Sequence, residues 1–198
     1  IKKEQPDILI TADKGLAFCE KTGMIPTQIV GDFDTLGEAL LPKYEAMGVP
    51  IRRFQPEKDY TDTEIAVHLA MELGAERITI LGASEGNRLD HLFGNVMTMM
   101  APAKEGIECF MLDAHNRVRI LTKPLELRKE DQYGKYISLI PLTTDVYGVT
   151  LTGFKYPLWD HRFHVETTGS LGISNELVDD VGKIDFRQGI LLMLECMD

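Results

Sequence analysis

Carboxylate side chains recur in the first half of this 198-residue sequence, each just after a short apolar run. The clearest case is the pair Asp32 and Asp34, which follow Ile29 and Val30 and are separated by Phe33. In an extended segment, residues two apart project to the same side, so both carboxylates could reach one ion. Magnesium is bound by carboxylate oxygens, usually with water and the phosphates of a substrate. The pair therefore suggests a metal-assisted reaction of a nucleotide triphosphate.

Further aspartates stand at equivalent places along the chain, namely Asp13, Asp59, Asp62 and Asp90. Taken one at a time, each has an ordinary explanation, because Asp often caps a turn or the start of a helix. Taken together, so many acids after successive strands favour a common edge that carries a cation. We expect magnesium with a nucleotide triphosphate there.

Phosphate groups would need donors, and two segments offer them. Residues 81–91, with the sequence LGASEGNRLDH, contain Gly82 and Gly86, which let a backbone approach a ligand closely. Arg88 follows, just before the N-terminus of a predicted helix, where free N–H groups favour an anion. Lys58 lies in a second segment with Asp59 and Asp62. The glycine pair alone is weak support, because an ordinary strand-to-helix turn would look the same.

The elements that would position these groups alternate along the first half of the chain. Short apolar runs predict strands, and segments with apolar residues at helical spacing predict helices between them. The strands are expected at residues 7–13, 27–34, 49–54, 76–83 and 107–113, and the helices at 14–23, 35–48, 61–74 and 89–101. Such alternation indicates a mainly parallel sheet covered by helices on both faces. The carboxyl ends of its strands share one edge, where ligands bind in open sheets.

The second half has a different pattern, with short strands separated by turns rich in Gly, Pro and Thr. These strands are expected at residues 117–121, 125–128, 136–142, 146–154, 163–168, 183–186 and 189–195. We predict an all-β sandwich, similar to a jelly roll. The expected fold is thus an α/β domain over residues 1–114 followed by a sandwich over residues 115–198. Trp159 is expected in a turn between strands.

Composition narrows the classes of function. The formal charge of −10 argues against a nucleic-acid binder, which needs a basic face. No apolar run is long enough to cross a membrane, which takes about 20 residues. The three cysteines are far apart and form neither a metal spacing nor a disulfide framework, so we expect a cytoplasmic protein. His161 and His164 are a weak zinc pair, because no further ligands accompany them.

Four segments in order resemble thiamin pyrophosphokinases of the bacterial type: GDFDT at 31–35, EKDYTDTEIA at 57–66, GNRLDHLFGN at 86–95 and GSLGISNEL at 169–177. The resemblance runs from about Ile8 to the C-terminus. It implies transfer of a diphosphate from ATP to the hydroxyl of thiamin, giving thiamin diphosphate and AMP. It also implies an α/β domain, a sandwich, and a homodimer that shares the thiamin site between chains.

Motif by motif, the resemblance implies roles for particular residues. The magnesium ligands would be Asp32, Asp34 and Asp62. The groups at the reacting atoms would be Asp34, Asp62, Arg88 and Asp90. ATP would be bound by Asp13, Lys58, Asp59, Arg88, His91 and Asn95. Thiamin would be bound by Asp90, Ser174 and Asn175.

The sequence departs from the family at three places. Its first loop has Asp13, Lys14 and Gly15 where the family often has Asp-Gly-Gly, and Thr35 stands where Ser is commoner. The family also has an earlier strand and a glycine-containing loop for which this sequence shows no counterpart. Other functions stay open on the residues alone: diphosphate transfer to another alcohol such as a hydroxymethyl pterin, nucleotide-sugar transfer through the Asp-x-Asp pair, or ligand sensing without catalysis.

Overall fold

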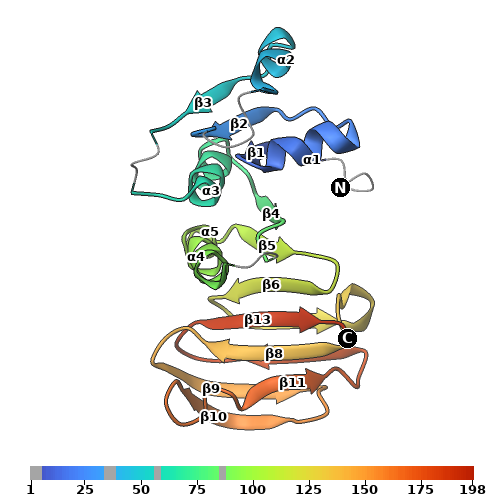
Figure 1. Ribbon diagram of the computed structural model, residues 1–198. Coiled ribbons are helices and arrows are strands. Elements are labelled where there is room, and N and C mark those ends of the chain that lie inside the picture. Colours follow the sequence, from blue (N-terminus) through green and yellow to red (C-terminus); the bar gives the residue numbers. More distant parts are fainter. Residues whose placement is uncertain (1–5, 34–38, 56–58, 85–87) are drawn as a thin grey trace. The chain divides into compact units, whose positions relative to one another are not determined.

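The computed structural model describes residues 6–33, 39–55, 59–84 and 88–198 (Figure 1). The chain divides into two compact units, Ile1–Glu76 and Arg77–Asp198. The predicted boundary after residue 114 concerns functional domains, and it stays a prediction. In the described part of the chain, no helix is long and apolar enough to cross a membrane.

The first unit is a small α/β layer. Its elements are β1 (Ile10–Ala12), α1 (Gly15–Thr22), β2 (Gln28–Gly31), α2 (Leu41–Ala46), β3 (Ile51–Arg53) and α3 (Asp62–Glu72). The three strands are parallel in the order β1-β2-β3, with Ile10 opposite Gln28 and Ile29 opposite Ile51. Helix α1 packs against β1, and α3 packs against β1 and β2. A buried apolar cluster joins the strands to the helices, made of Leu16, Ile29, Phe33, Leu41 and Tyr44.

The ends of two helices follow from their sequences. Helix α1 ends at Gly23, which adopts a left-handed conformation with φ of 68° and donates its N–H to Cys19 O. Helix α3 begins after Thr61, whose Oγ1 accepts a hydrogen bond from the N–H of Glu64 at 3.2 Å. Both helices lie within the ranges predicted from the sequence, residues 14–23 and 61–74.

The second unit contains the remaining elements. They are β4 (Arg77–Leu81), α4 (Leu89–Thr98), α5 (Met100–Lys104), β5 (Glu108–Leu112), β6 (Asn116–Leu121), β7 (Leu125–Arg128), the 3-10 turn η1 (Lys129–Asp131), β8 (Tyr136–Pro141), β9 (Asp145–Thr152), β10 (Leu158–His164), β11 (Gly172–Glu176), β12 (Val181–Asp185) and β13 (Leu191–Cys196). Helix α5 packs against β5 and β6, and α4 lies beside α5 (Figure 1).

Two sheets form the sandwich. One has six strands in the order β11-β8-β13-β6-β5-β4, and the other has four in the order β10-β9-β12-β7. The core between them draws on both sheets. It includes Ile137, Leu139, Leu191 and Met193 from the six-stranded sheet and Val149, Leu151, Phe163 and Ile184 from the four-stranded one. An N-terminal parallel sheet with helices followed by a β sandwich confirms the predicted fold class.

Three details differ from the prediction. Strands β4 and β5 are parallel, as expected, but they continue the six-stranded sheet because β5 pairs antiparallel with β6 across a short turn. Trp159 lies within β10, so its placement in a turn was wrong. The strand predicted at residues 163–168 ends at His164, and β11 was not expected. Strand β10 pairs with β9 through two register shifts, which break the alternation that predicts a strand.

Candidate functional site

Two of the predicted carboxylates lie at one edge of the first unit. Asp13 follows β1 and donates its N–H to Val30 O of β2 at 3.0 Å. Asp32 follows β2, next to Gly31, whose carbonyl accepts the N–H of Phe54 at 3.1 Å. Because β1 and β2 are parallel neighbours, both aspartates stand at the carboxyl edge of the sheet, as predicted.

Phe33 anchors this edge to the core. Its side chain is only 2% exposed and belongs to the buried cluster of the first unit. Its backbone is left-handed, with φ of 60°, and Asp13 is also left-handed, with φ of 41°. Such conformations are uncommon outside glycine and cluster where function requires them. The buried ring thus anchors Phe33, and with it the chain directly after Asp32.

Gly31 makes the tight packing at this edge possible. Its φ is 156°, and a Cβ atom there would lie 3.2 Å from Phe33 Cε1 and 3.4 Å from the backbone nitrogen of Asp13. A residue with a side chain would press on the ring of Phe33 and on the end of β1 at once. The glycine of the GDFDT segment therefore has a steric reason, which the sequence alone did not reveal.

The aspartates of the EKDYTDTEIA segment, Asp59 and Asp62, lie before and at the start of α3. Asp62 is the first residue of the helix and stands in its first turn, where a negative charge is favourable. Asp59 is exposed in the segment before it. Asp34 and Lys58, by contrast, lie outside the described residues. Among the residues that the structure does describe, no group of three or more His, Cys, Asp and Glu side chains could hold a metal ion.

Arg88 and Asp90 form an ion pair at the start of α4 in the second unit. Arg88 Nε donates to Asp90 Oδ1 at 2.8 Å, and Nη2 donates to Oδ2 at 2.5 Å. These hydrogen bonds hold the pKa of Asp90 well below its usual range, and the carboxylate raises the pKa of Arg88. Both side chains are exposed, so the pair orients the guanidinium fork without burying it. His91, the next residue, is also exposed.

Asn95 is placed differently from an exposed ligand-binding residue. Its side chain is 7% exposed, and its Nδ2 donates to Ala83 O, in the segment after β4, at 2.9 Å. The following residue, Ser84, donates its Oγ to Asp113 Oδ2 at 2.5 Å. Asp113 directly follows β5, and the sequence interpretation did not include it. Its signal was available, because it too is an acid at the end of a predicted strand.

Ser174 and Asn175 lie in β11, on the sandwich. Ser174 is exposed, is left-handed with φ of 57°, and donates its N–H to Ser138 Oγ. Asn175 is 6% exposed and uses its side chain within the fold. Its Oδ1 accepts the N–H groups of Tyr156 and Glu176, and its Nδ2 donates to Tyr156 O at 2.8 Å. Asn175 thus fixes the backbone of Tyr156, whose own ring is exposed.

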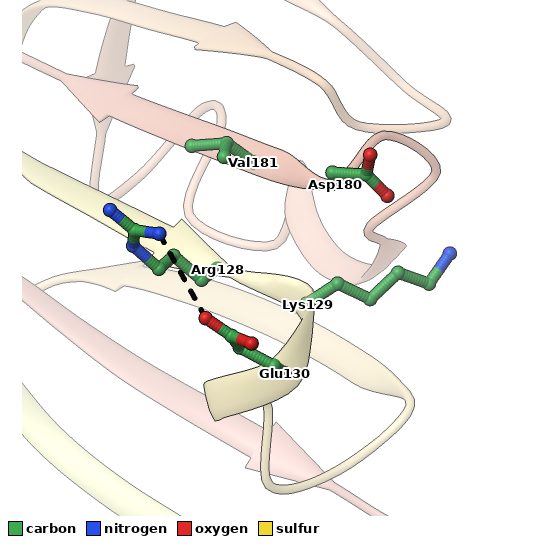
Figure 2. Close-up of a pocket in the computed structure, with 5 residues that line it drawn as sticks. All are labelled: Arg128, Lys129, Glu130, Asp180 and Val181. Atoms are coloured by element: carbon green, nitrogen blue, oxygen red, sulfur yellow. Dashed lines mark ion pairs between the residues drawn. The ribbon is translucent and has the colours of Figure 1, made fainter.

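A pocket of about 230 Å³ lies elsewhere on the sandwich, where β7 ends and β12 begins (Figure 2). It is lined by Arg128, Lys129, Glu130, Asp180 and Val181. Arg128 Nη1 and Glu130 Oε1 are 3.8 Å apart, and Lys129 extends away from them (Figure 2). The described residues of the predicted site do not line this pocket, and its mixed charges favour no particular ligand.

Comparisons with known proteins agree with the motifs. Residues 2–111 match the family described as thiamin pyrophosphokinase, catalytic domain, and residues 124–191 match thiamin pyrophosphokinase, vitamin B1 binding domain. The chain is 33% identical to the thiamine pyrophosphokinase of Bacillus subtilis (strain 168) over 195 residues, which cover 98% of this chain and 90% of that protein.

Solved structures give the same result. The B. subtilis thiamine pyrophosphokinase superposes with a TM-score of 0.87 at 33% identity, covering 98% of this chain and 90% of that one. The thiamin pyrophosphokinase of Geobacillus thermodenitrificans gives 0.85 at 32% identity, covering 100% and 90%. The yeast enzyme, at 17% identity and a TM-score of 0.77 over 96% of this chain and 78% of its own, shares the fold.

Proposed function

Because the chain belongs to the thiamin pyrophosphokinase family and is an ATP-dependent thiamine diphosphokinase, we propose that its carboxylate edge serves this reaction by holding magnesium. The observation that carries the proposal is the pair Asp13 and Asp32 at one sheet edge, anchored by the buried ring of Phe33. The proposed ligands are Asp32, Asp34 and Asp62. Their carboxylate oxygens are hard donors of the kind that magnesium takes.

In the proposed reaction, the hydroxyl oxygen of thiamin attacks the β-phosphorus of ATP and AMP leaves. Magnesium, when bound, would neutralise charge on the phosphate oxygens. The protein itself contributes mainly position and charge, as in other phosphoryl transfers. Arg88, held by Asp90, offers a planar fork that suits a phosphate group, and Asp90 is also the candidate contact for thiamin.

The remaining ATP contacts are proposed by motif. Asp13 and Asp59 would lie near the nucleotide and its metal, with Lys58 and His91 toward the phosphates. Asn95 differs, since its amide is already committed to Ala83 O, and its role is developed below. We further propose that residues 1–114 form the nucleotide-binding domain and residues 115–198 the thiamin-binding and dimerisation domain. The extents of the two family matches support this division.

We propose that thiamin binds on the sandwich beside Ser174 and Asn175, in a homodimer whose chains share the site. Exposed apolar side chains near this strand support the assignment. Ile173 lies in β11 itself and is 44% exposed, and Tyr156, which Asn175 holds, is 59% exposed. Aromatic rings suit thiamin, which is a cation. A cytoplasmic location is also proposed, and the free thiols of Cys19, Cys109 and Cys196 are consistent with it.

One assay tests the proposed function against its alternatives. The protein is incubated with ATP, magnesium and one candidate alcohol at a time, and AMP is measured by chromatography. We expect AMP with thiamin, in equal amount to thiamin diphosphate, and none with a hydroxymethyl pterin. Release of AMP with the pterin alone would indicate another diphosphotransferase. Thiamin binding without AMP would indicate a sensing protein, and either result would refute diphosphate transfer to thiamin.

A further inference from the structure

The segment that joins β4 to α4 is held at its start by two side chains from other elements. Ala83 O accepts a hydrogen bond from Asn95 Nδ2 of α4 at 2.9 Å. Ser84 Oγ donates to Asp113 Oδ2, beyond the end of β5, at 2.5 Å. Gly82, just before them, turns the chain with a left-handed φ of 71°. Two consecutive residues are therefore fixed from two directions, one through the backbone and one through a side chain.

Asp113, which accepts the hydrogen bond from Ser84, is itself held in place by further hydrogen bonds. Asp113 Oδ1 accepts the backbone N–H groups of His115 and Asn116, both at 2.7 Å, and the side-chain amide of Asn116 at 3.1 Å. The carbonyl oxygen of Asp113 accepts the hydroxyl of Tyr133 at 2.5 Å. These bonds hold the carboxylate in place independently of Ser84, so the hairpin between β5 and β6 supports the segment.

Charge strengthens this contact. Burial by itself would raise the pKa of Asp113, but hydrogen bonds from Ser84, His115 and Asn116 outweigh it, so the pKa is lowered. The carboxyl group is thus ionised at neutral pH. A hydroxyl that donates to a carboxylate makes a shorter and stronger bond than one between neutral groups. The contact is therefore well suited to hold a backbone in one conformation.

We propose that Asn95 and Asp113 are positioning residues that hold residues 82–84, which directly follow β4, in the form that binds ATP. This inference rests on the proposed function, because it assigns residues 82–84 to the phosphates of ATP. Preorganisation matters here because a misplacement of about 1 Å at a reacting group can cost on the order of a hundredfold in rate. Neither residue needs to touch the nucleotide.

The alternative is that the two bonds only stabilise the fold. The two explanations differ in a measurable way. A purely structural bond lowers the unfolding temperature and leaves the substrate constants of the folded enzyme unchanged. A positioning bond raises KM for ATP while KM for thiamin stays the same, because only one substrate faces this segment.

The test compares three variants with a matched control. Ser84→Ala removes the hydroxyl, Ser84→Thr keeps it, and Asn95→Asp replaces the donor by an acceptor. Thr98→Val is the control, because Thr98 Oγ1 donates a partly buried hydrogen bond to Gly94 O, on the same helix as Asn95, and not to Ala83 or Ser84. Rates of AMP formation are measured with ATP varied at saturating thiamin, and then with thiamin varied at saturating ATP.

We expect Ser84→Ala and Asn95→Asp each to raise KM for ATP about tenfold, as loss of one hydrogen bond worth about 1.4 kcal/mol implies. KM for thiamin should stay within about twofold, and Ser84→Thr and Thr98→Val should resemble the unmodified protein. Combining Ser84→Ala with Asn95→Asp should raise KM for ATP by less than the product of the two single increases, because both substitutions release the same segment. A value of KM for ATP that is unchanged in Ser84→Ala would overturn the inference.

Equilibrium binding of a non-hydrolysable ATP analogue separates this inference from the proposed function. If the unmodified protein forms no AMP with thiamin, the proposed acceptor is wrong, and the affinity for the analogue still reports on the segment. Weaker binding in Ser84→Ala, restored in Ser84→Thr, supports the positioning role. Equal affinity for the analogue in the unmodified protein, Ser84→Ala and Ser84→Thr refutes the positioning role, whichever alcohol accepts the diphosphate.

Discussion

The packing around Gly31 makes Gly31→Ala a sharp test of how the carboxylate edge is built. A φ of 156° lies in a region that residues with side chains rarely adopt, and such backbone strain costs about 1–3 kcal/mol. The new methyl group would also lie 3.2 Å from the ring of Phe33 and 3.4 Å from the backbone nitrogen of Asp13. Neither neighbour can yield easily, because Phe33 is buried and the N–H of Asp13 is bonded to Val30 O.

Crowding of this kind in a packed site costs typically about 1–3 kcal/mol. We expect Gly31→Ala to lower the free energy of unfolding by about 2–4 kcal/mol in total. This is less than the sum of the two upper limits, because a small shift of the backbone would reduce the strain and the crowding together. The same displacement should move Asp32, so AMP formation should fall well beyond what the loss of folded protein explains. Urea unfolding followed by circular dichroism gives the first quantity, and the rate of AMP formation gives the second.

Gly74→Ala is the matched control. Gly74 is also left-handed, with φ of 80°, but a Cβ atom there would meet nothing within 4 Å. Its variant should cost only the left-handed strain, about 1–2 kcal/mol, and should keep its activity. If Gly31→Ala lost no more stability and no more activity than Gly74→Ala, the steric explanation of the edge would be refuted.

Three further predictions concern the sandwich unit. Asn175→Ala should lower the free energy of unfolding by about 2–3 kcal/mol, because it leaves the partly buried backbone groups of Tyr156 unpaired, and it should raise KM for thiamin but not for ATP. The pKa of Asp113 is lower in the folded than in the unfolded protein, so its contribution to stability is present above about pH 4 and is lost as pH falls through the folded pKa. Asp113→Asn should therefore flatten the decline in unfolding temperature as the pH falls below about 4, and an unchanged decline would contradict the assignment. Glu195→Ala should cost about 3–5 kcal/mol in urea unfolding, because it leaves Arg117 without its buried carboxylate, and a cost below about 1 kcal/mol would exclude a structural ion pair.

The parts of the fold that depend on local sequence were predictable. Apolar runs indicated the strands of the first unit, and helical spacing of apolar residues placed α1 and α3 within the predicted ranges 14–23 and 61–74. The position of Asp13 and Asp32 followed from strand direction alone, because parallel strands bring their carboxyl ends to one edge. These features need no knowledge of distant contacts.

Other features depend on contacts between distant residues, which periodicity does not encode. The six-stranded sheet takes in β4 and β5 because Phe110 pairs with Arg119 across the β5–β6 hairpin. Strand β11 was missed because its sequence, GISNE, is mostly polar and holds its place through side-chain bonds such as those of Asn175. The left-handed backbone of Phe33 accompanies the burial of its ring, which is also a contact with distant residues.

The site was predictable as a set of residue types, and less so as a set of roles. Asn95 was assigned to ATP, yet its amide is bonded to Ala83 O, and only the structure could show that. Asp113 ends the fifth strand as the other acids end theirs, and it could have been included by the same rule. Its partner, Ser84, was not identifiable, because the two residues come from different loops.

The most direct test of the central claim is the rate of AMP formation by Asp34→Asn with ATP, thiamin and magnesium. The substitution keeps size and removes the charge that a magnesium ligand needs. Asp7→Asn, an exposed position outside the predicted site, serves as control. We predict that Asp34→Asn forms no detectable AMP while its circular dichroism spectrum matches that of the unmodified protein, and that Asp7→Asn is fully active. Near-normal AMP formation by Asp34→Asn would contradict the assignment of this edge to magnesium.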